Sequence, residues 1–176
     1  MEKGSKCIKN FIFINLKKIN IIFRGGFLSQ TITEKDILDL AAKIAVQARL
    51  DPKIDKSQIE NLIASLEGAS DPENSPIITA IYAHRQAGRN EIGYETAKLI
   101  SETMCKLYSL RYKKDDARRL LVLAKWIYES FDVFGKEEKD KEKRERIIRE
   151  KIREKLSGNI KELTIQDVLR ILSKNS

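Results

Sequence analysis

The chain has 176 residues, enough for one domain with a real hydrophobic core. Charged residues make up 34% of it, above the ~25% typical of globular proteins, and only 8 Gly and 3 Pro interrupt it, which favours long helices. Two cysteines exclude a disulfide framework and a cysteine-rich zinc site. The composition therefore favours a reduced, all-α protein, which we expect to be cytoplasmic.

The net charge of +8 is concentrated at the amino terminus. Residues 1–24 contain six Lys or Arg against one Glu, and are rich in the Ile, Lys, Asn and Phe of AT-rich codons. Arg24-Gly25-Gly26 can be encoded by a ribosome-binding sequence and Leu28 by an alternative start codon, so we expect residues 1–27 to come from a start assigned too early. The alternatives are an added β-strand or arm, or a membrane contact. The segment lacks the ~20 apolar residues of a transmembrane helix and the cleavage site of a signal peptide.

Apolar residues repeat every three to four positions along most of the remaining chain, which predicts seven helices. Thr33 begins the first, with Asp36 completing a capping box, and Asp51-Pro52 ends it. Ser57 caps a second, shorter helix, which we expect Gly68 to end in a left-handed conformation.

Three longer helices follow. Ser75-Pro76 places a proline in the first turn of the third helix, which runs to Gly88, and a fourth is expected over about 90–111. Asp115–Phe134 predicts the fifth helix, and its apolar residues lie nearly all the way round, as in a helix buried by its neighbours. We assign six residues of this helix to the core: Leu120, Leu121, Ala124, Trp126, Ile127 and Phe131.

The composition changes after the fifth helix. Every residue of Lys136–Arg146 is charged, and the interleaved acids and bases favour i, i+4 ion pairs on a solvated helix that ends at Gly158. Thr164 caps a last short helix. We therefore predict a compact bundle of about five helices over 28–135 and a charged helical extension over 136–176.

No motif predicts catalysis or cofactor binding. His84 is the one histidine, and no Cys or carboxylate cluster stands at ligand spacing beside it. Glycine-rich phosphate loops and nucleophile elbows are absent from the sequence. We therefore expect a protein that is not an enzyme and has neither a metal nor a cofactor.

Basic residues form two candidate nucleic-acid-binding patches. The first lies at the end of the third helix, where Arg85 and Arg89 share one face and His84 is adjacent. Arginine at such a position suits phosphate groups, which dominate affinity for nucleic acids. The alternative is an ordinary solvated surface, on which the arginines pair with Glu91 or Glu95.

The second patch lies at the turn between the fourth and fifth helices. Only Asp115 and Asp116 offset it along the sequence, which predicts a local net charge of +4. Tyr108 and Tyr112 lie beside it and are suited to stacking on bases. Its basic residues are Arg111, Lys113, Lys114, Arg118, Arg119 and Lys125.

The segment Ile77–Ile100 followed by Leu120–Phe134 resembles the small, all-helical subunits of CRISPR effector complexes of type III and some type I systems. The shared features are an apolar segment that leads into a basic Ala87-Gly88-Arg89 and a late apolar helix with Trp126–Phe131 near its end. The resemblance covers roughly residues 33–134.

This resemblance implies a non-catalytic structural subunit of an antiviral ribonucleoprotein. Several copies of the chain would stack along the other subunits and line the path of the guide RNA and target strand. Arg85, Arg89 and the Arg111–Arg119 patch would then contact phosphates, and no membrane would be involved.

Two other classes of function stay open. A stand-alone DNA-binding regulator would use the last two helices and the turn Gly158–Leu163 as a helix-turn-helix variant. A protein–protein adaptor would hold a partner helix with the apolar stripe of residues 147–172. The salt dependence of binding distinguishes these classes of function. Binding to nucleic acid weakens steeply as the salt concentration rises, whereas apolar docking does not.

Overall fold

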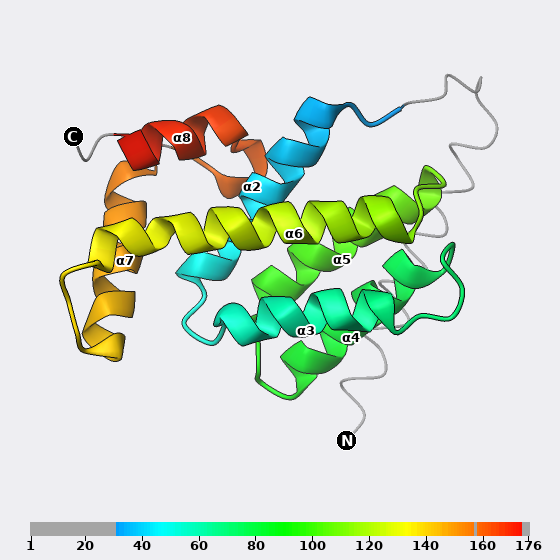
Figure 1. The fold of residues 1–176 in the computed structure, drawn as a ribbon, viewed down its shortest axis with the longest axis horizontal. Helices are drawn as coiled ribbons and strands as arrows, with labels where there is room; N and C mark the ends of the chain where they lie inside the picture. The colour runs from blue at the N-terminus through cyan, green and yellow to red at the C-terminus, as the bar shows by residue number, and fades with distance from the viewer. Residues whose placement is uncertain (1–30, 157, 174–176) are drawn as a thin grey trace. The chain divides into compact units, whose positions relative to one another are not determined.

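The structure, a computed structural model, describes residues 31–156 and 158–173. These residues form seven α-helices and two short 3-10 helices, which confirms the predicted all-α class (Figure 1). Among them no helix is both long and apolar enough to cross a membrane. The predictions for residues 1–27 lie outside the described residues. In chain order the elements are α2 (Glu34–Leu50), α3 (Lys56–Glu67), α4 (Ser75–Gly88), α5 (Tyr94–Ser109), α6 (Lys114–Ser130), η1 (Phe131–Gly135), α7 (Lys141–Lys155), η2 (Ile160–Glu162) and α8 (Ile165–Ser173).

Helices α2 to α6 enclose the larger of two hydrophobic cores. The inner face of α6 contributes Leu120, Leu121 and Ala124, all fully buried as predicted, and Ile127 is partly buried beside them. These positions follow the i, i+3, i+4 spacing of one helix face. Figure 1 shows α6 running across the bundle in front of α5. The five-helix core therefore forms around the helix that the sequence singles out.

A second, smaller core joins α2 to the carboxyl-terminal helices. Phe131 is fully buried there, as predicted, although it lies in η1 because the α-helix ends at Ser130. The described residues from Ile32 onward form one compact unit, so the helices predicted as an extension pack against the bundle. The buried residues of this second core are Ala42, Val46, Phe131, Ile148, Ile152, Leu163, Val168 and Ile171.

One residue assigned to the core from the sequence, Trp126, is not buried in the structure. Its side chain is 62% exposed, so the prediction that it is buried was wrong. The inner face of α6 is already filled by Leu120, Leu121, Ala124 and Tyr128, and Trp126 lies outside this stripe. The other apolar residues outside the stripe, Val122, Leu123 and Ile127, are half-buried, so Trp126 alone of the apolar residues of α6 is exposed.

Helix boundaries differ from the predictions where a side chain other than the expected one caps the helix. Thr33 and Asp36 form the predicted capping box of α2. At α3, however, Asp55 rather than Ser57 is the cap, because its carboxylate accepts hydrogen bonds from the first-turn backbone. Gly68 ends α3 with φ −69°, in the right-handed region and not the predicted left-handed one.

The charged segment also begins differently. Residues 136–140 are not helical, and α7 starts only at Lys141. Asp140 caps it by accepting a hydrogen bond from the backbone N–H of Lys143, at 2.9 Å. At α8 the predicted cap is present, since Asp167 and Thr164 exchange hydrogen bonds between side chain and backbone.

Asp51 joins the end of α2 to the start of α5. Its Oδ2 accepts hydrogen bonds from the backbone N–H of Gly93 (2.6 Å) and from the hydroxyl of Thr96 (2.7 Å), and its Oδ1 accepts one from the N–H of Lys53 (3.0 Å). This contact explains why α5 begins at Tyr94, later than predicted. A β-carbon on Gly93 would lie 2.5 Å from Asp51 Oδ2, so a larger residue there would displace the carboxylate.

We expect Gly93→Ala to lower the free energy of unfolding by about 2 kcal/mol or more, because it breaks buried hydrogen bonds of Asp51. The matched control is Gly88→Ala at the end of α4, where a β-carbon meets no atom within 4 Å. That variant should change stability by less than about 0.5 kcal/mol. Urea unfolding followed by circular dichroism measures both, and equal effects would contradict the role of Asp51.

Trp126→Ala should leave the free energy of unfolding within about 1 kcal/mol of the parent, because the side chain is exposed. Leu120→Ala, on the buried face of the same helix, should cost about 2–5 kcal/mol. Thermal and urea unfolding of the two variants tests the assignment of the two faces of α6. A loss at Trp126 as large as that at Leu120 would show that the indole is packed.

Candidate nucleic-acid interface

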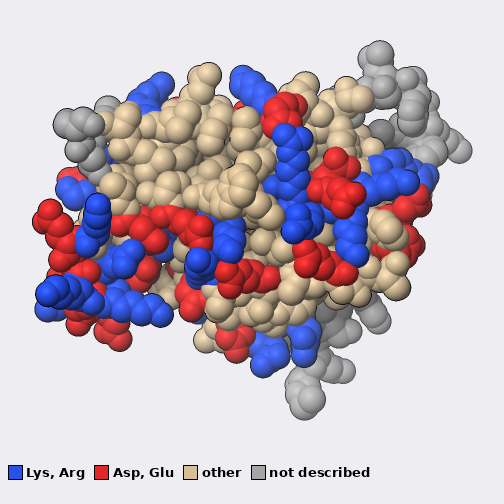
Figure 2. Space-filling view, in the orientation of Figure 1, with Lys and Arg blue, Asp and Glu red and all other residues tan. Residues whose placement is uncertain are grey.

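The second predicted patch lies at the start of α6 and in the turn before it. Figure 2 shows Lys and Arg side chains interleaved with Asp and Glu along α6. Lys114 points inward, and its ammonium donates hydrogen bonds to the carbonyls of Glu67 (2.8 Å) and Ala69 (3.1 Å). This lysine therefore ties α6 to the end of α3.

Acidic residues neutralise this patch. They come from α2, from α3 and from the loop before α4, far away in sequence. With Asp115 and Asp116, six acidic residues accompany six basic ones, so the predicted net charge of +4 was wrong. The ion pairs are Arg118–Glu67 (2.7 Å), Lys125–Glu60 (2.7 Å), Lys113–Glu73 (3.4 Å) and Arg119–Glu34.

These ion pairs also shift the pKa values of two of the paired side chains. The hydrogen bond to Glu67 raises the pKa of the Arg118 guanidinium, and the hydrogen bond from Lys125 lowers the pKa of the Glu60 carboxyl. Both groups are thus held in their charged forms. A phosphate would have to compete with these carboxylates for the cations of α6.

Arg111 is different from the rest of this patch. It sits in the turn before α6 with φ 64° and is exposed, and no carboxylate in the described part of the chain lies within ion-pair distance of it. Of the two neighbouring tyrosines, Tyr108 is 42% exposed. Tyr112 is partly buried, and its hydroxyl accepts a hydrogen bond from Ile32 N (2.8 Å) and donates one to Ile32 O (3.1 Å). Only Tyr108 is therefore placed for stacking.

The first predicted patch keeps its positive charge. Arg85 and Arg89 are exposed at the end of α4, and over residues 31–156 and 158–173 neither makes an ion pair, including the pairs considered with Glu91 and Glu95. Lys53, from the loop between α2 and α3, joins them, because its ammonium donates a hydrogen bond to the side chain of Asn90. We call Lys53, Arg85 and Arg89 the α4-end patch.

Sequence reasoning missed Lys53, because it lies more than thirty residues before the arginines and belongs to no motif. His84, beside the patch, packs its ring 6.5 Å from that of Tyr94. Burial lowers the pKa of the His84 imidazole below its usual 6.5, so this side chain is neutral near pH 7. The charge of the patch therefore comes from Lys53 and the two arginines.

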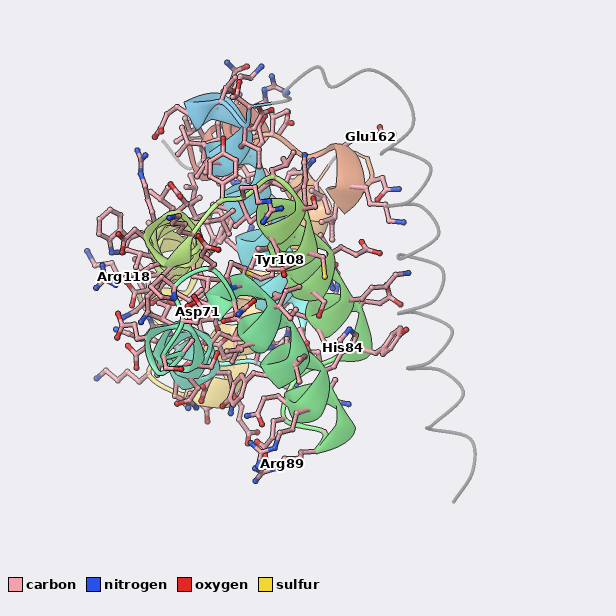
Figure 3. The ribbon with its side chains drawn as sticks, turned by 90° about the vertical axis from the view of Figure 1, so that its right-hand side faces the viewer. Asp71, His84, Arg89, Tyr108, Arg118 and Glu162 are labelled. Carbon is pink, nitrogen blue, oxygen red and sulfur yellow. The ribbon has the colours of Figure 1, made fainter. Side chains whose placement is uncertain are left out.

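The predicted residues do not form one continuous surface. Figure 3 shows Arg118 on one side of the bundle and His84 on the other, with Arg89 at the lower end of the molecule in that view. Tyr108 lies near the end of α5, whereas the α4-end patch lies near its start. The two predicted patches are therefore separate contact areas.

The described residues contain no group of three or more His, Cys, Asp or Glu that could hold a metal ion. A depression of about 590 Å³ lies where α3, α6 and α7 meet, and acidic and basic side chains line it together. Comparison with known proteins finds no matching family, no matching curated protein and no matching solved structure. The surface of the molecule is therefore the basis for an argument about function.

Proposed function

We propose that the chain is a non-catalytic, nucleic-acid-associated structural subunit of a CRISPR ribonucleoprotein effector complex, in which it lines the guide–target path. The observation that carries this proposal is the α4-end patch: its three cations are exposed and make no ion pair with any described residue. The sequence resemblance supplies the kind of complex. Other subunits, the guide RNA, the target strand and further copies of the chain are the proposed partners.

The local structure suits contacts with phosphates. Arg85 and Arg89 are one helical turn apart, so their guanidinium groups can reach neighbouring points of a strand. The guanidinium fork binds phosphate oxygens in pairs, and such contacts set position without reading sequence. Helix α4 packs closely on α5, where the Ser101 hydroxyl donates to the carbonyl of Ala80 at 3.1 Å. The cations are thus presented from a rigid support.

Arg111 and Tyr108 supply a second, smaller contact in this proposal, because an unpaired cation stands next to an exposed aromatic ring. Lys113, Lys114, Arg118 and Arg119 have a lesser part. Each already bonds a carboxylate or a carbonyl, so a phosphate gains less there than at the α4-end patch.

A helical protein–protein adaptor is the second candidate, and a different observation favours it. Three large apolar side chains on α6, η1 and α8 are more than half exposed: Trp126 (62%), Val133 (51%) and Leu169 (57%). Figure 2 shows an uncharged area where Figure 1 places α8 and the second half of α6. Apolar surface of this kind suits a partner protein. The stripe predicted for this role within 147–172 is not available, because Ile148, Ile152, Val168 and Ile171 are buried.

The regulator hypothesis has less support. Helix α8 would be the recognition helix, yet its outward face carries the apolar Leu169, and Arg170 pairs with Asp167 at 3.3 Å. A recognition helix needs several polar side chains that reach base edges.

The identity of the partners is tested by gentle affinity purification of the tagged chain from its natural host, with mass spectrometry and RNA sequencing of the eluate. Recovery of effector-complex subunits with short repeat-derived RNAs is the expected result. Recovery with proteins and no nucleic acid would replace the proposal by the adaptor, and recovery with DNA alone would replace it by the regulator.

Two double variants with the same change in net charge test the interface. Arg85→Gln with Arg89→Gln should weaken binding of a single-stranded RNA about tenfold or more and reduce the slope of log affinity against log salt by about one to two. Arg118→Gln with Arg119→Gln should weaken it less than about threefold, because these cations are already paired. Fluorescence anisotropy at several salt concentrations measures both, with melting temperatures as the folding control. Equal losses would mean that net charge, and not the α4-end patch, determines binding.

A further inference from the structure

We propose that α7, η2 and α8 form a clasp that opens as a unit about residues 136–140, and that an ion pair between α2 and α7 holds it closed. We use "clasp" for residues 141–156 and 158–173. Figure 1 shows α7 and α8 gathered at one end of α6, away from α4 and α5. This inference concerns the fold and is independent of the proposed nucleic-acid role.

The clasp packs in the second core, which it shares with α2 and η1. None of its residues belongs to the buried core of α2 to α6. Five of the eight buried side chains of the second core belong to the clasp, whereas α2 contributes Ala42 and Val46, and η1 contributes Phe131. Opening the clasp therefore leaves the main core intact and uncovers the second core alone, which lowers its free-energy cost relative to global unfolding.

The segment that would act as the hinge is suited to movement. Residues 136–140 are all charged, lie outside the helices and are mostly exposed. Gly135, the residue before this segment, packs tightly against α7 in the closed form. A β-carbon on Gly135 would lie only 2.6 Å from Cγ of Arg144. The backbone should therefore rotate most easily just after Gly135, where tight packing gives way to the exposed loop of residues 136–140.

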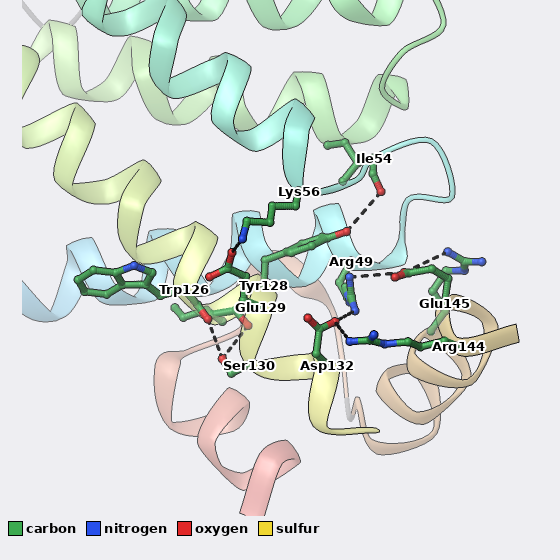
Figure 4. Close-up of polar contacts among 12 residues, drawn as sticks. Arg49, Ile54, Lys56, Trp126, Tyr128, Glu129, Ser130, Asp132, Arg144 and Glu145 are labelled. Atoms are coloured by element: carbon green, nitrogen blue, oxygen red, sulfur yellow. Dashed lines mark hydrogen bonds and ion pairs between the residues drawn. The ribbon is translucent and has the colours of Figure 1, made fainter. Parts of the chain in front are cut away.

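Arg49 of α2 lies at the junction and is 3% exposed (Figure 4). Its guanidinium carbon is 4.4 Å from the centre of the Tyr128 ring, and one terminal nitrogen bonds Asp132 of η1. The other terminal nitrogen is 3.4 Å from Glu145 Oε2 in α7. Arg144 of α7 also approaches Asp132, at 3.4 Å. Arg49 thus has partners on both sides of the hinge.

Because Arg49 has partners on both sides of the hinge, the clasp can open without leaving the buried guanidinium unpaired. Tyr128 and Asp132 belong to α6 and η1, so they would stay with Arg49 when the clasp moves away. Two side chains of α7 would leave: Arg144, which is 3.4 Å from Asp132, and Glu145, which is partly exposed already and has Arg149 nearby at 3.9 Å. A buried cation that keeps one carboxylate and gains water avoids the large penalty of an isolated buried charge. We call the Arg49–Glu145 ion pair the latch, and Glu145 is the member of this pair that moves away with the clasp.

Further contacts join the clasp to the rest of the chain, among them Lys155 Nζ at 4.8 Å from the centre of the Phe134 ring of η1. Asp39 of α2 accepts a hydrogen bond from the backbone N–H of Ile165, at 2.8 Å, at the start of α8. It is remote from Glu145 in the chain, so neutralising Glu145 leaves it in place. The effect of Glu145 can therefore be measured separately from that of the α8 contact.

Native-state hydrogen exchange with mass spectrometry on the full chain tests the proposal. Helices of 15 and 9 residues are marginally stable in water without tertiary packing, so α7 and α8 should lose helical structure once they leave α2. Their amides should then exchange through an opening that leaves those of α3 to α6 protected. Glu145→Gln should accelerate exchange in the clasp at least about threefold and leave α3 to α5 unchanged. Glu150→Gln, a change of equal charge at an exposed position of α7, is the matched control and should change neither region.

Three results would overturn the inference. Equal protection of the clasp and of α3 to α6 would show that the molecule opens only globally. Acceleration by Glu145→Gln throughout the chain would mean that Glu145 stabilises the whole fold. A clasp that exchanges early but responds equally to both variants would exclude Arg49–Glu145 as the latch.

Discussion

The burial of α2 on two sides is the constraint on which the rest of the structure depends. One side of this helix packs into the core of α2 to α6 through residues such as Ile37 and Ile44, and another side packs into the second core through Ala42 and Val46. The many alanines of α2 let neighbouring helices approach from both directions. A helix enclosed in this way cannot place polar residues freely, so its polar contacts concentrate at its ends.

The carboxyl end of α2 shows the result. Arg49 and Asp51 are both nearly buried and two residues apart, yet they serve opposite parts of the molecule. Arg49 holds the junction of η1 and α7, whereas Asp51 fixes the start of α5. By fixing the start of α5 and accepting a hydrogen bond from the N–H of Lys53, Asp51 also helps to position the α4-end patch.

Much of this fold follows from local sequence signals, because caps and apolar periodicity act over a few residues. Thr33, Asp36 and Thr164 mark helix starts correctly, and the stripe through Leu120 and Ala124 identifies a buried face. The errors are of another kind. Trp126 could not be assigned from periodicity, because the apolar residues of α6 extend round most of the helix and the sequence does not say which position the neighbouring helices leave uncovered. The ion partners of α6 were invisible for the same reason, since they come from α2, α3 and the loop before α4.

That second error bears directly on function. A run of basic residues on one helix predicts attraction for phosphates only if the packing brings no carboxylates beside it, and here packing brings four. Position at a helix end does not decide the outcome, since Lys113 at the start of α6 is paired with Glu73, whereas Arg85 and Arg89 at the end of α4 make no ion pair with the described residues. Arg111 and Lys53, in turns between helices, likewise make none. In a chain that is one-third charged, the distribution of pairing therefore discriminates better than the density of basic residues. An electrostatic argument for binding in such a protein has to begin from the residues that the fold leaves without a counter-charge.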